Sequence, residues 1–237
     1  MATAIVTPEV RKTHPASAML YADIKGFTSM MSRLEALRPD IRARRMRRFV
    51  KAWGEFRDAL IRPKPKRKFS GFYLANRVGD AFIVLVFPTD PKIWLEYVRG
   101  YLPAKFGKLA KVMQKIDPGL APHLKVSMYT TPEKRVAYYE TDVISDEVMG
   151  HMTISRRDFF STAINRCARM DAFPAADTSE LVCNQAIRNF LVREGSISPR
   201  EFRSLGLKAL RGFEGEPKER HFAMIGRPSS DRLSGQR

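Results

Sequence analysis

Two aspartates, Asp23 and Asp80, have the sequence surroundings of residues that can do chemistry. Asp23 ends an apolar stretch rich in strand formers, and after Gly26 the chain enters a segment with helical spacing at residues 29–34. A strand, a tight loop and a helix start would hold the carboxylate and direct the backbone N–H groups of residues 25–28 toward an anion. This pattern suggests a divalent cation bound together with a polyphosphate. Taken alone, the stretch favours a purely structural role, in which Asp23 caps the helix and Gly26 turns the chain.

Asp80 strengthens the chemical interpretation. It follows Gly79 between two apolar runs that span residues 74–87, which is the pattern of a β-hairpin with an acid at its tip. If this hairpin lies beside the strand that carries Asp23, the two carboxylates can share metal ions. Two carboxylates and a triphosphate describe two-metal phosphoryl transfer, in which one ion activates a nucleophilic oxygen and the other holds the departing pyrophosphate.

A third polar set lies in residues 158–169, which we predict to be a helix. The spacing of four places Asn165 and Arg169 on one face, with Asp158 two turns upstream on roughly the same side. For a single helix, such a stripe is more typical of a solvated surface than of a site. The order of the three segments along the chain is much more specific than any one of them.

These segments together resemble the class III nucleotidyl cyclases. Residues 21–28, Tyr-Ala-Asp-Ile-Lys-Gly-Phe-Thr, resemble the family's first metal motif, and Gly79-Asp80 resembles its hairpin. Residues 164–169, Ile-Asn-Arg-Cys-Ala-Arg, are similar to its Val-Asn-x-Ala-Ala-Arg helix, and residues 210–213, Leu-Arg-Gly-Phe, to its Leu-Lys-Gly element. The resemblance covers residues 17–225. It implies an α/β fold, or α+β by strict segregation, with a mixed, largely antiparallel ferredoxin-like sheet flanked by helices.

The resemblance also implies roles for individual residues. Asp23 and Asp80, with the Ile24 carbonyl, would bind two divalent cations, Mn²⁺ or Mg²⁺. Asn165 would orient the ribose, and Arg169 would stabilise charge on the α-phosphate. The triphosphate would be held by the backbone amides of Lys25, Gly26, Phe27 and Thr28, with a further contact from Arg211, Lys218 or Arg220, among which spacing does not choose.

The resemblance implies two chains as well. In this family the metal carboxylates and the Asn/Arg pair of one site come from opposite subunits of a head-to-tail homodimer. A single domain that carries every motif would form two equivalent composite sites. Neither Asn165 nor Arg169 would then act on the metals of its own chain.

Base selection depends, in the same alignment, on Asn76 and Asp158. Adenylyl cyclases of the family have lysine at the first position and guanylyl cyclases have glutamate, whereas Asp158 is the residue type of adenylyl enzymes. A neutral amide offers both a donor and an acceptor, so it suits the edge of uracil or cytosine as well as a purine. Tyr73, Arg77 and Phe159 are large enough to narrow a base pocket, although each also suits ordinary packing.

The whole chain looks most like the stand-alone bacterial pyrimidine cyclases of anti-phage signalling. We therefore expect conversion of UTP to cyclic UMP and pyrophosphate, with cyclic CMP next and cyclic AMP as the conventional alternative. A separate effector protein would respond to the product. The alternatives of another class are a basic nucleic-acid-binding protein and a catalytically silent cyclase-fold module.

Length and composition fit this interpretation. With 237 residues and 44% hydrophobic content, the chain can form one medium catalytic domain at residues 17–225, between an arm at 1–16 and a flexible tail at 226–237. The sequence has neither a convincing signal region nor an uncharged apolar span, so we expect a cytoplasmic protein without membrane contact. Cys167 and Cys183 are expected to be reduced core thiols.

The net charge of +17 indicates a surface that attracts polyanions. The basic residues concentrate at 42–48, on a helical pattern, and at 62–68, in a Pro-broken linker. No recognition motif accompanies them, so we do not expect specific nucleic-acid binding. Steering of nucleoside triphosphates toward the site is the preferred role.

The remaining pattern predicts the supporting elements. Helices are expected at 29–62 with a break near 37–40, where Asp40 would cap the second part, at 93–116 and at 184–192. Strands are expected at 124–130, 135–139, 180–183 and 220–225.

Overall fold

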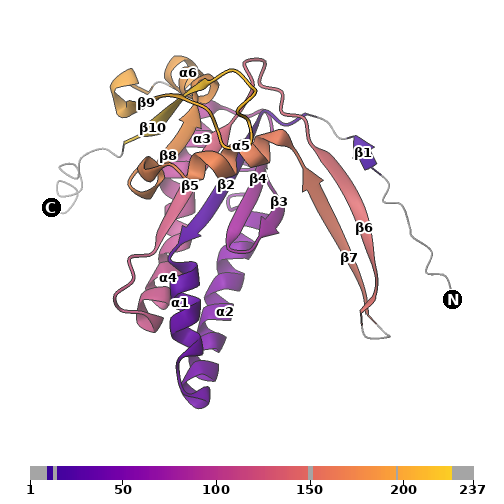
Figure 1. Cartoon of the computed structure of the whole chain (residues 1–237), viewed down its shortest axis with the longest axis vertical. Coiled ribbons are helices and arrows are strands. Elements are labelled where there is room, and N and C mark those ends of the chain that lie inside the picture. Colours follow the sequence, from indigo (N-terminus) through magenta and orange to yellow (C-terminus); the bar gives the residue numbers. More distant parts are fainter. Residues whose placement is uncertain (1–9, 13–14, 149–151, 196, 226–237) are drawn as a thin grey trace.

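The computed structural model describes residues 10–12, 15–148, 152–195 and 197–225, and it is built on a seven-stranded sheet (Figure 1). The strand order is β3-β4-β2-β5-β8-β10-β9, and every neighbouring pair is antiparallel except the parallel pair β5 and β8. This confirms the expected mixed, largely antiparallel sheet. The strands are β2 (Ala18–Lys25), β3 (Phe72–Val78), β4 (Ala81–Val86), β5 (His123–Tyr129), β8 (Leu181–Asn184), β9 (Phe202–Lys208) and β10 (Glu219–Met224).

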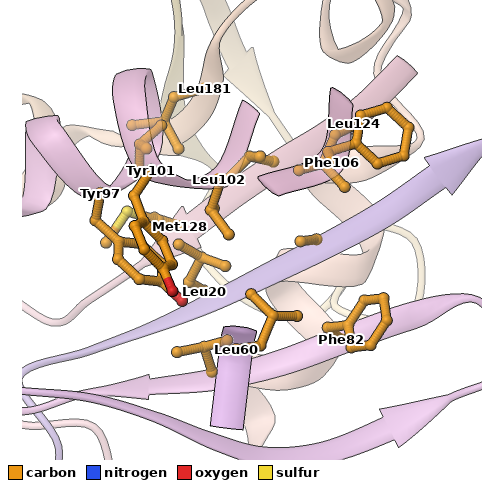
Figure 2. Packing of buried hydrophobic residues seen from close by; sticks show 14 of the residues in the cluster. Leu20, Leu60, Phe82, Tyr97, Tyr101, Leu102, Phe106, Leu124, Met128 and Leu181 are labelled. Atoms are coloured by element: carbon orange, nitrogen blue, oxygen red, sulfur yellow. The ribbon is translucent and has the colours of Figure 1, made fainter. Parts of the chain in front are cut away.

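Helices cover both faces of this sheet. The larger hydrophobic core lies under α1 (Phe27–Glu35), α2 (Pro39–Ile61), α3 (Pro91–Glu96), α4 (Leu102–Ile116) and α6 (Gln185–Glu194). Figure 2 shows Leu20 and Met128 of the sheet packed among Tyr97, Tyr101 and Leu102. The smaller core lies under α5 (Thr162–Asp171) on the opposite face. No helix in the described part of the chain has the length and apolarity needed to cross a membrane.

Alternation along β2 assigns its side chains to the two faces. Leu20, Ala22 and Ile24 belong to the larger core, whereas Met19 and Tyr21 pack with α5. Because successive side chains point to opposite faces, Asp23 lies on the α5 side. The strand thus places its carboxylate away from the larger core.

A separate three-stranded sheet extends from this body (Figure 1). It contains β1 (Val10–Lys12), β6 (Tyr139–Val148) and β7 (Met152–Phe160), all paired antiparallel. The long hairpin β6–β7 was not predicted, since its mixed polar sequence lacks the apolar alternation of a half-buried strand. The strand expected at 135–139 is wrong over most of its length, because only Tyr139 lies in β6 and Val136 forms an isolated bridge with Ala16.

The boundaries of the helices α2, α3 and α4 can be compared with those expected from the sequence. The break near 37–40 and the long helix at 93–116 are confirmed, with a π-helical turn at Tyr97–Tyr101 joining α3 to α4. Asp40 does not cap α2: Arg38 is at the N-cap and Pro39, whose fixed φ suits the first helical position, begins the helix. Strand β9 was not foreseen. The tail at 226–237 lies outside the described residues.

The helix at 184–192 and the two thiols behave as expected. Asn184 caps α6, because its side-chain oxygen accepts a hydrogen bond from the Ile187 N–H at 3.3 Å. Cys167 and Cys183 are free and buried. These residues therefore contribute to folding and packing.

His221 provides a pH-sensitive element of this fold. The imidazole is fully buried and its ring nitrogens have no hydrogen-bond partner within the described structure. Glu219 Oε2 lies 4.0 Å from Nε2, and the Phe173 ring is edge-on at 5.3 Å. Burial, aided by the Arg166 charge, lowers the pKa of His221 to about 4.

The first prediction follows from that shift. Unfolded histidine titrates near 6.5, so the unfolded chain binds an extra proton as the pH falls from about 6.5 to 4, and the free energy of unfolding should drop by up to about 3 kcal/mol. Urea denaturation of the wild type and of His221→Leu across this pH range measures this loss of unfolding free energy. The variant should lose less stability over the same interval, and identical losses in both proteins would contradict the assignment to His221.

Candidate active site

Asp23 reaches the site from the end of β2, where the backbone turns through Gly26. Gly26 has φ 90° and precedes α1, whose first turn begins at Phe27. The left-handed backbone conformation favours glycine at this position, and a Cβ there would lie 2.4 Å from Leu120 Cδ1, so the leucine side chain would have to shift. Because glycine has no side chain to cap α1, the N–H groups of the first turn are left for another acceptor. The expected strand, loop and helix start are confirmed.

Asp80 is brought to the same place by the hairpin. Gly79, at φ 61°, and Asp80 form the turn between β3 and β4, and β4 pairs with β2 in a register that matches Phe82 with Ala22. Continuing that register by two residues places Asp80 beside Ile24. Burial raises the pKa of the Asp80 carboxyl, and the negative charge of Asp23 raises it further. The expected convergence of the two acids at one end of the sheet is therefore present.

An internal cation already lies against this pair. Lys125, on the neighbouring strand β5, places its Nζ 3.2 Å from Asp23 Oδ2 and 2.6 Å from Asp171 Oδ2 at the end of α5. All three side chains are at most 19% exposed. Burial alone would lower the pKa of Lys125, but Asp171 and Asp23 together raise it above the ordinary value. The ammonium therefore stays charged and balances Asp23.

Sequence analysis missed both Lys125 and Asp171, although each has a detectable signal. Lys125 is a charged residue between two apolar ones inside a strand pattern. Asp171 is an acid in the last turn of a helix, where the helix dipole disfavours negative charge, so it calls for a cationic partner. Together they indicate a buried ion pair.

The helix that carries Asn165 and Arg169 is shorter than predicted. Ser161 caps α5 by accepting a hydrogen bond from the Ala163 N–H at 3.1 Å, and the helix starts at Thr162. The prediction of a helix from residue 158 is wrong: Asp158 lies in β7, opposite Thr141 of β6. The Ser161 cap separates strand from helix, so Asp158 does not share a helix face with Asn165.

The polar face of α5 points away from its own sheet. Ala163, Cys167 and Met170 are buried against the smaller core, whereas Asn165 and Arg169 are exposed. Within the described residues, neither side chain forms a hydrogen bond or an ion pair with Asp23 or Asp80. The amide and the guanidinium therefore face solvent and, within the described residues, are not bonded to the carboxylates of their own chain.

Arg166 fixes the rotation of α5. Its guanidinium lies 4.4 Å from the Phe213 ring and 5.2 Å from the Tyr129 ring, and it is ion-paired with Glu216 and with Glu219 at 3.4 Å. This buried anchor ties α5 to the loop between β9 and β10.

The same loop carries Arg211 and Lys218, and β10 carries Arg220; these are the basic residues among which the sequence did not choose. Arg211 follows the buried Leu210 in the turn at Gly212, whose φ is 86°. Lys218 and Arg220 instead line a cavity of about 450 Å³ beside the start of α6. The structure thus separates Arg211 from the other two.

The two positions expected to select the base lie on strands that contact each other, β3 and β7. Asn76 follows a bulge in β3, and its side-chain oxygen accepts a hydrogen bond from the Arg77 N–H at 2.7 Å. Asp158 is on β7, opposite Thr141 of β6.

The donor set fits a divalent cation in part. No group of three or more His, Cys, Asp or Glu side chains in the described regions is arranged to hold a metal ion. Asp23 and Asp80 provide two hard oxygen ligands, and the ammonium of Lys125 shows that this position accommodates positive charge. Further oxygen ligands would have to come from the Ile24 carbonyl, water or a bound phosphate.

The architecture has the fold of class III nucleotidyl cyclase catalytic domains. A bacterial light-regulated adenylyl cyclase matches with a TM-score of 0.51 and 10% identity, over 93% of this chain and 54% of its own length. The fold assignment rests on this match, and this chain spans about half of that protein. No protein-family model and no curated protein sequence matches the chain.

Two further solved structures give weaker matches. The guanylyl cyclase domain of the RhoGC fusion protein from the aquatic fungus Blastocladiella emersonii has a TM-score of 0.47 and 15% identity, covering 92% of this chain and 99% of its own. An adenylate cyclase from Trypanosoma brucei has a TM-score of 0.42 and 15% identity, covering 91% and 93%.

The Lys125 contact generates the second prediction. In Lys125→Met the carboxylates of Asp23 and Asp171 lose their counter-ion, so the metal-free protein should be destabilised by roughly 1–3 kcal/mol. Added Mn²⁺ should raise the melting temperature of the variant more than that of the wild type, because the cation no longer competes with the ammonium.

Thermal denaturation with and without Mn²⁺ measures both effects. Lys125→Met combined with Asp171→Asn is the matched control, since it removes the ammonium together with its second carboxylate partner. This double variant should regain part of the lost stability and keep the enhanced response to Mn²⁺. An unchanged Mn²⁺ response in both variants would show that Lys125 does not limit cation binding.

Proposed function

We propose that this protein is a nucleotidyl cyclase, which converts a nucleoside triphosphate into its 3′,5′-cyclic monophosphate and pyrophosphate. The carrying observation is the pairing of β4 with β2, which brings Asp80 beside the end of the strand that holds Asp23. On a fold of the class III cyclase type, these carboxylates occupy the positions at which the sequence resembles the family's metal motifs. Two divalent cations, Mn²⁺ or Mg²⁺, are the proposed cofactors.

The reaction is an in-line displacement at the α-phosphorus. The ribose 3′-oxygen forms a bond to that phosphorus while the bond to the pyrophosphate oxygen breaks, and the hydroxyl proton leaves to solvent. Asp23, Asp80 and the Ile24 carbonyl would hold the cations, which supply a lowered pKa for the 3′-hydroxyl and neutralise the β- and γ-phosphates. Backbone N–H groups of residues 25–28, at the start of α1, would bind the triphosphate, with Arg211 as a further contact.

Asn165 and Arg169 would complete the site from a second copy of the chain. Both are exposed on the outward face of α5, which is held in that rotation by Arg166. A head-to-tail homodimer would place this face over the carboxylates of the partner. Asn165 would then orient the ribose, and Arg169 would stabilise the charge that develops on the α-phosphate oxygens.

We further propose that the base is a pyrimidine and that UTP is the substrate. Asn76 and Asp158 would recognise the base, and this pair combines a neutral amide with an acid. Cyclic UMP would then act as the messenger of a bacterial anti-phage system and be read by a separate effector. Cyclic CMP and cyclic AMP are the alternative products.

The third prediction concerns the product. Purified protein incubated with each of the four nucleoside triphosphates and Mn²⁺ should release pyrophosphate and form cyclic UMP at the highest rate, as measured by chromatography and mass spectrometry. Asp23→Asn should reduce the rate at least about 100-fold, because the cations lose a ligand. Asp40→Asn, which removes an exposed carboxylate from α2, should leave it unchanged.

The possible outcomes separate the levels of the proposal. Cyclic AMP as the sole product would refute the pyrimidine assignment and keep the cyclase. Absence of any cyclic product from a folded, metal-loaded protein would refute the cyclase itself and favour a catalytically silent module.

The fourth prediction concerns the composite site. Asp23→Asn and Arg169→Ala should each be nearly inactive, whereas a mixture should recover up to about a quarter of wild-type turnover, since random pairing gives half heterodimers with one intact site each. Arg193→Ala, an exposed arginine on α6, is the control and should keep full activity. Continued inactivity of mixtures in which heterodimers are demonstrated by differential tagging would contradict shared sites.

A further inference from the structure

A groove between α2 and α4 is lined by basic residues that the proposed reaction does not use. Two contacts show that the helices run antiparallel. Arg45 Nη1, near the start of α2, donates to the carbonyl of Ile116 at the end of α4 at 3.1 Å, and Glu55, farther along α2, pairs with Nζ of Lys108, nearer the start of α4, at 2.9 Å. The groove between these two contacts has a volume of about 640 Å³.

Basic side chains line both walls of this α2–α4 groove. Arg44, Arg48 and Lys51 follow one stripe of α2 at spacings of four and three, and Lys108 and Lys115 are seven residues apart on α4. At a rise of 1.5 Å per residue, each row is about 10 Å long. The groove therefore presents a double row of positive charge.

Most of this charge is not balanced by the protein. Arg44, Arg48 and Lys115 make no hydrogen bond or ion pair within the described part of the chain, whereas the acid lining the groove, Glu55, is paired with Lys108 and is also attracted to Lys51. Like charges at a spacing of four weaken a helix by a few tenths of a kcal/mol per pair. The row on α2 thus works against the stability of its own helix, and an external anion would relieve it.

The lining identifies the chemical class of that anion. Arginine guanidinium groups bind phosphate oxygens in a bidentate manner, and a repeated row of them suits a repeated phosphate. No aromatic side chain lines the groove, so unpaired bases would find no stacking surface. Cationic side chains outnumber apolar ones in the lining, where Ala52 and Ile116 are only 8% and 2% exposed and Val112 is partly exposed, so an amphipathic protein helix would meet mostly charged side chains.

We propose that the α2–α4 groove binds the sugar–phosphate backbone of duplex nucleic acid, independently of base sequence. One phosphate ridge would lie along the groove, with about two or three phosphates within reach of the cationic rows. This differs from the specific recognition that the sequence gave no reason to expect, because the phosphates carry no sequence information. The cations of α4 complete the site, and their position relative to the basic run at 42–48 is visible only in the folded chain.

The fifth prediction tests this site with fluorescence anisotropy on a 20-base-pair DNA duplex and an RNA duplex of the same sequence. The groove variant Arg44→Glu/Arg48→Glu/Lys115→Glu is compared with Lys64→Glu/Lys66→Glu/Arg67→Glu, which changes three exposed cations of the 62–68 linker. Both variants change the net charge by the same amount, from +17 to +11. Any effect of total charge is therefore matched.

We expect the wild type to bind both duplexes at 150 mM salt, with an affinity that falls as salt rises. The groove variant should bind at least about 10-fold more weakly, and the slope of log K against log salt should shrink by about 2–3, at 0.9 per lost phosphate contact. The affinity of the linker variant should stay within about twofold of the wild-type affinity, because at this salt concentration screening limits the electrostatic reach of an exposed charge to about 8 Å.

Several results would overturn the proposal. Equal losses in the two variants would assign binding to net charge, and undetectable binding of wild type at 150 mM salt would exclude the site. Groove-dependent binding of polyglutamate without duplex binding would indicate an acidic protein partner. If circular dichroism shows that the charge-reversed groove variant is unfolded, Arg44→Gln/Arg48→Gln/Lys115→Gln provides the same comparison against the equivalent linker variant with glutamine. None of these readouts depends on cyclase activity.

Discussion

The antiparallel pairing of β4 with β2 is the constraint on which the site depends. It takes a hairpin tip that is 57 residues away in the chain and places its acid beside the end of the central strand. Two carboxylates brought together in this way repel each other, and burial adds to the cost of keeping both ionised. Lys125 offsets that cost from the neighbouring strand, with Asp171 as its second partner. The fold therefore holds, without any ligand, an arrangement whose charges suit a divalent cation.

The other half of the proposed chemistry is fixed by packing on the opposite side of α5. Ala163, Cys167 and Met170 fill the smaller core, and the Arg166 guanidinium is held between two aromatic rings and two carboxylates. With those positions buried, a helix of 3.6 residues per turn must turn Asn165 and Arg169 outward. Within the described residues, neither side chain bonds to the carboxylates of its own chain. This outward orientation supports the proposal that a second subunit supplies the other half of the site.

Local pattern was sufficient to predict the parts of the site that are determined locally. The strand ending at Asp23, the turn at Gly26 and the hairpin at Gly79-Asp80 follow from apolar alternation and turn residues, and all three are present. Prediction failed at Asp158, because an apolar and aromatic run before a helix suits either a helical or an extended backbone, and the Ser161 cap decided the boundary. The roles of Lys125 and Asp171 were not predicted, because they depend on contacts between β2, β5 and α5, which no single stretch of sequence reveals. The long β6–β7 hairpin was not predicted, because a hairpin that is not paired with the main sheet lacks the apolar alternation of a half-buried strand.

The distribution of charge explains why one chain can combine an acidic site with a strongly basic surface. Cations near Asp23 are neutralised internally: Lys125 pairs with two carboxylates, and Lys25 lies 2.8 Å from Asp177. Excess positive charge instead lies on exposed surfaces. It occurs in the linker at 62–68 and in the α2–α4 groove, where the arginines of α2 have solvent on one side and the lysines of α4 on the other. At physiological salt, exposed charges more than about 8 Å apart are largely screened from each other. The proposed cation site and the proposed phosphate groove are therefore compatible within one chain, because each field is confined to the residues that generate it.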